Sequence, residues 1–155
     1  MDQRIFKRKI YDKILKWKEE NHGKTALLIE GARRVGKSTI VEEFARKEYQ
    51  SCIIIDFNKA RKEVKELFED LMDLDLLFLK LQQMYHVELI DRNSVIIFDE
   101  VQECPEALNS LKYFYEEANQ YHITAAGSLL GTLLAKPKSY PVGMVDILHV
   151  YPLTF

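Results

Sequence analysis

Cysteine and histidine are scarce in this sequence, and their positions point to no metal or disulfide chemistry. The 155 residues include two cysteines and four histidines, with no C-x-x-C motif and no metal-ligand spacing among them. Cys52 and Cys104 lie far apart in the sequence, which favours two separate thiols in a reducing compartment. We therefore expect neither a disulfide framework nor a zinc-binding module.

Long apolar runs and a strong net charge are also missing. No run is long enough to span a membrane and the amino-terminal segment is too charged for a signal peptide, so we expect a cytoplasmic protein without membrane contact. The formal net charge of −2 gives no overall attraction to nucleic acid. Residues 1–24 hold eight Lys or Arg against four acidic residues. We interpret this basic segment as a solvated helix face, which leaves nucleic acid as a partner without further support.

Short apolar runs alternate with amphipathic segments along the chain, which is the pattern of an α/β domain. Because strand–helix–strand connections are right-handed crossovers, we predict a parallel sheet covered on both faces within one domain, residues 1–155. The expected strands cover residues 25–30, 52–57, 95–100, 122–128 and 145–151. The expected helices cover residues 4–20, 38–48, 59–72, 76–86, 105–119 and 129–135, with a break at 73–75. Pro137 and Pro141 indicate a loop.

One stretch carries a specific motif. Residues 31–38, GARRVGKS, fit the phosphate-binding pattern G-x-x-x-x-G-K-[ST]. An apolar strand precedes the motif and an amphipathic helix follows it, which is the context that this loop needs. A simple glycine-bearing turn would not require Lys37 and Ser38 after the second glycine. The stretch therefore predicts a nucleotide site.

Each position of the loop has a physical role in holding a phosphate. Gly31 and Gly36 permit close approach of the backbone, and the amino end of the following helix adds unpaired N–H groups and a positive dipole end. Lys37 can reach the β- and γ-phosphates, and Ser38 offers a hydroxyl to Mg²⁺. The side chains of Arg33 and Arg34 are expected to face solvent. The backbone amides that would point at the anion belong to Arg34, Val35, Gly36, Lys37, Ser38 and Thr39.

Polar residues also follow two other apolar runs, and in a parallel sheet such residues meet at one edge. Asp99 ends the third run, where a buried carboxylate would be costly without a cation, so we assign it to Mg²⁺. Glu100 is the candidate base for a water that attacks the γ-phosphate. Ser128, after the fourth run, either senses that phosphate or caps the next helix. Gln102 and Glu103 are close enough in sequence to reach the same site.

Together these residues resemble the AAA+ ATPase superfamily, and more narrowly predicted bacterial and archaeal ATPases with an N-terminal AAA module and a poorly characterised C-terminal domain. The resemblance implies a three-layer αβα P-loop NTPase core with strand order 5-1-4-3-2. It implies Walker A at 31–38, Walker B at Asp99 and Glu100, and a sensor at Ser128. It also implies ATP as the nucleotide, a basic helix near the adenine, and a helical lid and further domain after position 155. The matching pieces are GARRVGKST, VIIFDEVQECPEALNSLKYFYEE, ITAAGSLLG and YPVGMVDILHVYPLTF.

Several activities stay open at this stage. The leading one is Mg²⁺-dependent hydrolysis of ATP to ADP that drives or switches a protein partner or the chain's own C-terminal domain. A nucleotide-dependent switch or scaffold with little turnover is the alternative, and a small-molecule phosphotransferase is disfavoured because the acid pair suits water activation. Ring-forming relatives supply an arginine from a neighbouring subunit, but no arginine follows Arg92 here, and the matching region offers Lys136 and Lys138. Lysine lacks the planar fork of arginine. We therefore expect slow turnover by this chain alone, with self-association left open.

Overall fold

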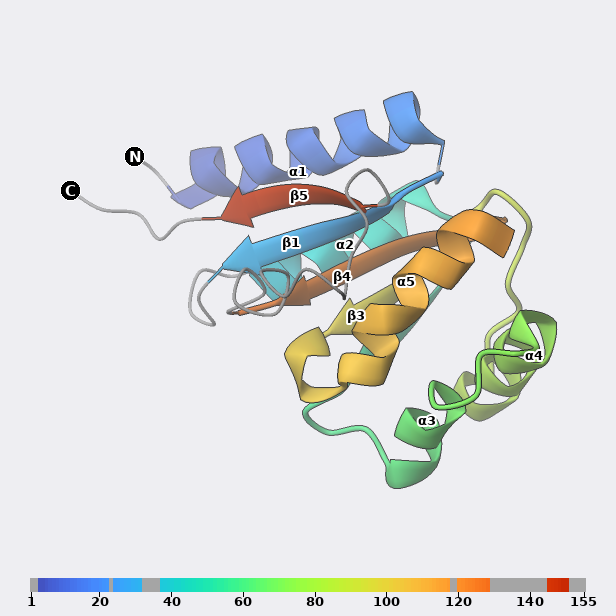
Figure 1. The fold of residues 1–155 in the computed structure, drawn as a ribbon. Helices are drawn as coiled ribbons and strands as arrows, with labels where there is room; N and C mark the ends of the chain where they lie inside the picture. The colour runs from blue at the N-terminus through green and yellow to red at the C-terminus, as the bar shows by residue number, and fades with distance from the viewer. Residues whose placement is uncertain (1–2, 23, 32–36, 118–119, 129–144, 151–155) are drawn as a thin grey trace.

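The computed structural model describes residues 3–22, 24–31, 37–117, 120–128 and 145–150 as a sheet between helical layers, with α2 behind the sheet and α5 in front of it in Figure 1. In the described parts, no helix is both long and apolar enough to cross a bilayer. The elements in chain order are α1 (Gln3–Asn21), β1 (Ala26–Gly31), α2 (Lys37–Glu48), β2 (Ser51–Asp56), α3 (Lys62–Leu67), α4 (Leu74–Tyr85), β3 (Ser94–Asp99), the 3₁₀ helix η2 (Val101–Glu103), α5 (Pro105–Glu117), β4 (His122–Gly127) and β5 (Val145–Val150).

The sheet has five parallel strands in the order β2-β3-β4-β1-β5, which read from the other edge is the predicted 5-1-4-3-2 and confirms it. Leu27 of β1 pairs with Thr124 of β4, and Ala26 pairs with Val145 of β5, so β1 has a neighbour on each side. β3 lies in the same way between β2 and β4. Because all strands run in one direction, their carboxyl ends meet at one edge of the sheet.

The first helical layer, α1 and α2, covers one face of the sheet. Apolar residues of both helices form a cluster with alternate residues of β1 and β3, since successive side chains of a strand point to opposite faces. Ile14 of α1 and Phe44 of α2 are at most 1% exposed. The basic residues Arg4, Arg8 and Lys9 are exposed, as predicted for a solvated face. The amphipathic pattern over 4–20 is therefore confirmed as a helix.

The second helical layer, α3, α4 and α5, covers the opposite face. At its centre Phe57, Phe68 and Phe98 make edge-to-face contacts, with ring centroids 5.3 to 5.6 Å apart. The ring of Phe114 on α5 lies 6.3 Å from that of Phe98, and Phe78 of α4 stacks on Phe114 at 5.4 Å. The aromatic rings thus join β3 to both α4 and α5.

The helix predicted over 59–72 was wrong in extent, because only Lys62–Leu67 is α-helical. Asp70 accepts a hydrogen bond from the amide of Met72 at 3.1 Å, and Asp73 accepts one from the amide of Leu76 at 3.0 Å. Such local bonds compete with helical hydrogen bonds. The chain therefore turns before Asp73, which becomes the N-cap of α4, and this helix begins at Leu74 instead of 76.

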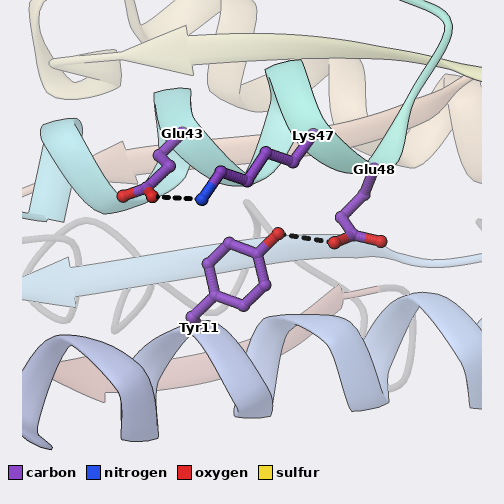
Figure 2. A network of polar contacts seen from close by, with 4 residues as sticks. All are labelled: Tyr11, Glu43, Lys47 and Glu48. Atoms are coloured by element: carbon purple, nitrogen blue, oxygen red, sulfur yellow. Dashed lines mark hydrogen bonds and ion pairs between the residues drawn. The ribbon is translucent and has the colours of Figure 1, made fainter.

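Polar contacts fix α1 to α2. The Tyr11 hydroxyl donates a hydrogen bond to the Glu48 carboxylate at 2.5 Å, and the Lys18 ammonium donates to the Glu48 carbonyl oxygen at 2.8 Å. Figure 2 shows the first contact beside the Glu43–Lys47 ion pair of α2, in which nitrogen and oxygen are 2.7 Å apart. Burial, together with the Glu48 carboxylate, raises the pKa of Tyr11 above its ordinary value. The phenol therefore stays protonated and remains a donor.

The carboxyl end of α1 is tied to the sheet as well. The Asn21 amide nitrogen donates to the Thr25 hydroxyl at 2.7 Å, and that hydroxyl donates to Asp146 of β5 at 2.6 Å. The Thr25 amide in turn donates to the Asn21 side-chain oxygen at 2.7 Å. These contacts make α1 an integral layer of the domain.

A buried polar pair lies near the amino ends of the strands, where the Tyr49 hydroxyl and Nδ1 of His122 are 2.6 Å apart. The Trp17 ring meets the His122 ring edge-on at 5.8 Å, and the Lys18 ammonium lies 4.7 Å from the centre of the Tyr49 ring. Burial, followed by the nearby charges of Lys18 and His22, lowers the pKa of His122 to about 4, although a backbone hydrogen bond with His22 acts in the other direction. His122 is therefore neutral near pH 7.

Candidate nucleotide site

The carboxyl edge of the sheet gathers the polar residues that the sequence singled out. β1 ends at Gly31, β3 ends at Asp99, and Ser128 directly follows β4. α2 begins at Lys37, at the same edge, and its first turn has N–H groups without helical partners. The edge thus combines the amino end of a helix with a carboxylate and a hydroxyl, which is a suitable setting for a bound phosphate.

Most of the phosphate-binding loop lies outside the described residues. The structure does not describe residues 32–36, which include Arg34, Val35 and Gly36, and it describes only the backbone of Lys37. The roles expected for these residues therefore stay predictions. The same holds for the short helix and the loop expected between 129 and 144.

The described ends of the loop are consistent with a site open to ligand. Gly31 is half-buried and pairs with Val150 of β5. Thr39 is exposed in the first turn of α2, and Ser38 beside it is half-buried. A ligand at the amino end of α2 would therefore be reachable from solvent.

Ser38 and Asp99 are in direct contact. The Ser38 hydroxyl donates to Oδ1 of Asp99 at 3.1 Å, and the amide of Glu100 donates to the same oxygen at 2.9 Å. Asp99 is only 8% exposed. The pKa of its carboxyl group is raised above the ordinary value, mainly because of burial. The two hydrogen bonds lower this pKa, and the charges of Glu100 and Asp56 raise it. A cation beside Asp99 would offset the cost of keeping this carboxylate charged.

These two side chains fit Mg²⁺ in their chemistry. Mg²⁺ prefers oxygen ligands and is usually bound through one or two carboxylates, waters and the phosphates of a substrate. Within the described ranges, no group of three or more His, Cys, Asp or Glu is arranged to hold a metal ion. Ser38 and Asp99 could therefore hold Mg²⁺ together with oxygen atoms of a bound phosphate.

The sequence pattern predicted Glu100 as the last residue of the third strand, but it lies in the turn after that strand. β3 ends at Asp99, and Glu100 has a left-handed backbone with φ 52° and ψ 47°. A left-handed conformation costs a residue with a Cβ atom about 1–2 kcal/mol, and such strain is concentrated at functional sites. The turn leads into η2 and places the Glu100 carboxylate beside the side chain of Gln102.

Gln102 contacts both Glu100, which follows β3, and Ser128, which follows β4. Its Nε2 donates to Oε2 of Glu100 at 2.5 Å and lies 3.5 Å from Oγ of Ser128, at the limit of a hydrogen bond. Glu103, also expected near the site, has an exposed side chain. The sequence showed only that Gln102 was close in number to Glu100; the contact depends on the left-handed turn. The structure therefore brings Glu100, Gln102 and Ser128 together, next to Ser38 and Asp99.

A family model described as an AAA domain matches residues 23–155. The chain belongs to the AAA domain family. This finding agrees with the resemblance noted in the sequence. No curated protein sequence gave a match to the chain.

Solved structures confirm the fold of this AAA domain. The Walker-type ATPase PABY2304 of Pyrococcus abyssi is 21% identical, with a TM-score of 0.59 over 98% of this chain and 54% of that chain. A chain in the structure of Drosophila ORC bound to AT-rich DNA and Cdc6 is 13% identical, with a TM-score of 0.64 over 98% of this chain and 58% of that one. At such identities the likeness concerns the fold alone. The chain spans a little more than half the length of either neighbour.

A groove of the AAA domain between α1 and β5 lies away from these residues. Its lining includes Trp17 and Leu27 with the exposed side chains of Lys13 and Lys16. Leu27 is the second residue of β1, so the groove lies toward the amino ends of the strands. The polar groups that the sequence singled out converge at the opposite edge of the sheet.

Proposed function

We propose that this AAA domain binds ATP with Mg²⁺ and hydrolyses the bond between the β- and γ-phosphates. The observation that carries the proposal is the contact of Ser38 with Asp99 at the amino end of α2, with Glu100 as the next residue. The phosphate-binding motif supplies the other half of the site. Residues 1–155, with α1 included, form the nucleotide-binding domain in this proposal.

In this proposal different residues bind the phosphates and the Mg²⁺ ion. As the motif predicts, the amides from Arg34 to Thr39 would donate to the phosphate oxygens, and Lys37 would supply a positive charge to the β- and γ-phosphates. Ser38 and Asp99 hold Mg²⁺, which when bound neutralises charge on the phosphate oxygens. Binding therefore depends on the motif, and metal dependence on the Ser38–Asp99 pair.

Glu100 activates the attacking water. The water oxygen forms a bond to the γ-phosphorus, the bond to the bridging oxygen breaks, and ADP and phosphate result, while a proton of the water passes to the Glu100 carboxylate. Ser128 lies where a hydroxyl can sense the γ-phosphate or the water. Its hydroxyl lies 3.5 Å from Nε2 of Gln102.

The first turns of α1 lie beside the nucleotide in this proposal. Figure 1 shows the amino end of α1 at the same end of the molecule as the arrowheads of β1 and β5. The basic residue Arg4 is exposed there. The choice of ATP over GTP rests on the family.

A nucleotide-dependent switch is the second candidate, and the Gln102–Glu100 contact favours it. A carboxylate already engaged by an amide N–H at 2.5 Å is less available to take a proton from water. In this case bound ATP or ADP would set a conformation for a protein partner or for a C-terminal domain, and turnover would be slow. DNA appears in the Drosophila neighbour, but at 13% identity that feature is not extended to this chain.

Replacement of Glu100 by Gln tests the proposal, with Glu117→Gln, an exposed position on α5, as the matched control. Glu100→Gln keeps the size of the side chain but cannot accept the proton. We expect ATP binding to persist and hydrolysis to fall by roughly 10²–10⁴-fold, while the control behaves as wild type. Wild-type protein that binds ATP but turns it over no faster than Glu100→Gln would favour the switch. Wild-type protein without Mg²⁺-dependent ATP binding would contradict both candidates.

A further inference from the structure

Gln102 makes an unusual set of contacts for a side chain in a short 3₁₀ helix. Its Nε2 lies 2.5 Å from the Glu100 carboxylate and 3.5 Å from the Ser128 hydroxyl. Its Oε1 is buried and has no hydrogen-bond partner among the described residues. Buried polar atoms without partners are rare in folded proteins, and each one calls for an explanation.

The orientation of the amide explains the unpartnered oxygen. Rotation of the amide by half a turn would place Oε1 against the Glu100 carboxylate, where two oxygens that only accept would repel each other. The orientation with Nε2 toward Glu100 is therefore the favourable one, and it leaves Oε1 buried without a donor. In this orientation Oε1 of Gln102 has no hydrogen bond within the described part of the chain, while Nε2 donates one to the Glu100 carboxylate.

We infer that Gln102 is a positioning residue, which fixes the Glu100 carboxylate and links it to Ser128. The inference rests on the proposed hydrolysis of ATP. A general base works only when its carboxylate lies within hydrogen-bond reach of the water, and small displacements of a reacting group reduce rates strongly. A glutamate side chain has several rotatable bonds, and the hydrogen bond from Nε2 of Gln102 restricts them.

The two N–H groups of Nε2 give this link its geometry. One donates to Oε2 of Glu100, and the other is the group closest to Ser128. A shift of Ser128 toward a bound γ-phosphate would therefore act on Gln102 and, through it, on Glu100.

Two variants separate positioning from packing, with Gln83→Ala on the exposed side of α4 as the control. Gln102→Ala removes the amide, and Gln102→Glu keeps the length but replaces the donor by a second carboxylate. We expect both to lower kcat by roughly 10–100-fold, as for a misplaced catalytic group. The dissociation constant for ATP should stay within about threefold, or about 0.65 kcal/mol, because Gln102 is not part of the phosphate-binding motif. A packing role would leave Gln102→Glu close to wild type in kcat.

A double-mutant cycle tests whether Gln102 acts through Glu100. In a Glu100→Gln background the further change Gln102→Ala should have no effect on single-turnover hydrolysis, because the group that Gln102 positions is already disabled. Equal losses in both backgrounds, or a kcat of Gln102→Glu within twofold of wild type, would overturn the inference. Should Gln102→Ala fail to fold, the isosteric Gln102→Glu decides. Wild-type protein with no hydrolysis would instead refute the proposed function, so the two failures are distinguishable.

Discussion

The Ser38 hydroxyl and the Asp99 carboxylate, 61 positions apart in the sequence, are joined by a hydrogen bond of 3.1 Å between the start of α2 and the end of β3. The bond brings together the hydroxyl and the carboxylate that we propose as ligands of Mg²⁺. It also connects the helix that follows the phosphate-binding loop to the strand that precedes Glu100. Binding and hydrolysis would thus share one rigid edge of the sheet.

Replacement of Asp99 by Asn should weaken the effect of Mg²⁺ on ATP binding. Asn retains an oxygen that accepts from Ser38 but removes the charge that attracts the metal, so we expect the Mg²⁺-dependent gain in affinity to fall by roughly 10–100-fold. Calorimetric titration of ATP with and without Mg²⁺ measures this gain. Because Asp99 is buried, the neutral variant should unfold at a temperature close to that of wild type, and an unchanged Mg²⁺ effect would refute the metal assignment.

Lys37→Ala should weaken ATP binding without loss of the fold. A hydrogen bond to a charged group contributes about 1.5–3 kcal/mol, so the dissociation constant should rise by roughly 10–100-fold. Lys80→Ala, at an exposed position of α4, is the matched control and should bind as wild type does. Equal affinities of the two variants would remove the phosphate-binding role assigned to Lys37.

The buried His122 predicts a loss of stability in mild acid. Its pKa is about 4 in the folded protein against an ordinary value of 6.5, because burial and the charges of Lys18 and His22 disfavour its protonated form. The unfolded chain therefore binds the proton more readily. The stability contributed by neutral His122 is complete above about pH 6.5 and is lost as the pH falls toward 4. Between pH 7.5 and 5 the free energy of unfolding should decrease by about 2 kcal/mol from this group.

Urea unfolding of wild type and His122→Gln at both pH values isolates this contribution from that of other groups. Gln has no proton to bind but can still accept from Tyr49, so the variant should lose less stability in acid than wild type does. His86→Gln, at an exposed position, is the control and should show the full decrease. Parallel pH dependences for wild type and His122→Gln would show that burial and the charges of Lys18 and His22 do not hold His122 neutral.

Turnover by this chain alone should be slow and independent of protein concentration. No arginine follows Arg92, and an arginine aimed at the transferring phosphoryl group can contribute about 10³–10⁵ in rate. Lys136 and Lys138, which lie outside the described residues, offer only compact charges. The ATPase rate per subunit, measured over a wide concentration range, tests this expectation. A steep rise that Lys136→Ala/Lys138→Ala abolishes would contradict it, because the lysines would then act in a neighbouring subunit.

The sequence predicted the strands well because a parallel strand buried on both faces must be apolar throughout. Val95 to Phe98 satisfy this condition and are at most 2% exposed. The order of the strands could not be predicted in this way, because a pattern of apolar residues does not indicate which strand pairs with which. That order came from the resemblance to a family. The convergence of Asp99 and Ser128 followed from the rule that ligands bind at the carboxyl ends of parallel strands.

The errors have local causes. Residues 59–72 carry a helical pattern, but α3 ends at Leu67, and Asp70 and Asp73 beyond it accept local hydrogen bonds in place of helical ones. The contact of Gln102 with Glu100 depends on a left-handed backbone at a glutamate, which residue preferences do not favour. Side-chain geometry of this kind appears only once the turn after β3 is known.

The position of β1 in the sheet has a consequence for how the protein is made. Among the described strands, β1 is the first to leave the ribosome, and its neighbours β4 and β5 are the last two, with Leu27 paired to Thr124 and Ala26 to Val145. The nascent chain therefore carries an apolar strand without hydrogen-bonded neighbours while nearly all of the later helices and strands are synthesised. Pairings over such long stretches of chain form slowly, and an unpaired apolar strand can associate with other chains in the meantime. We expect newly made chains to rely on chaperones until β4 and β5 have emerged.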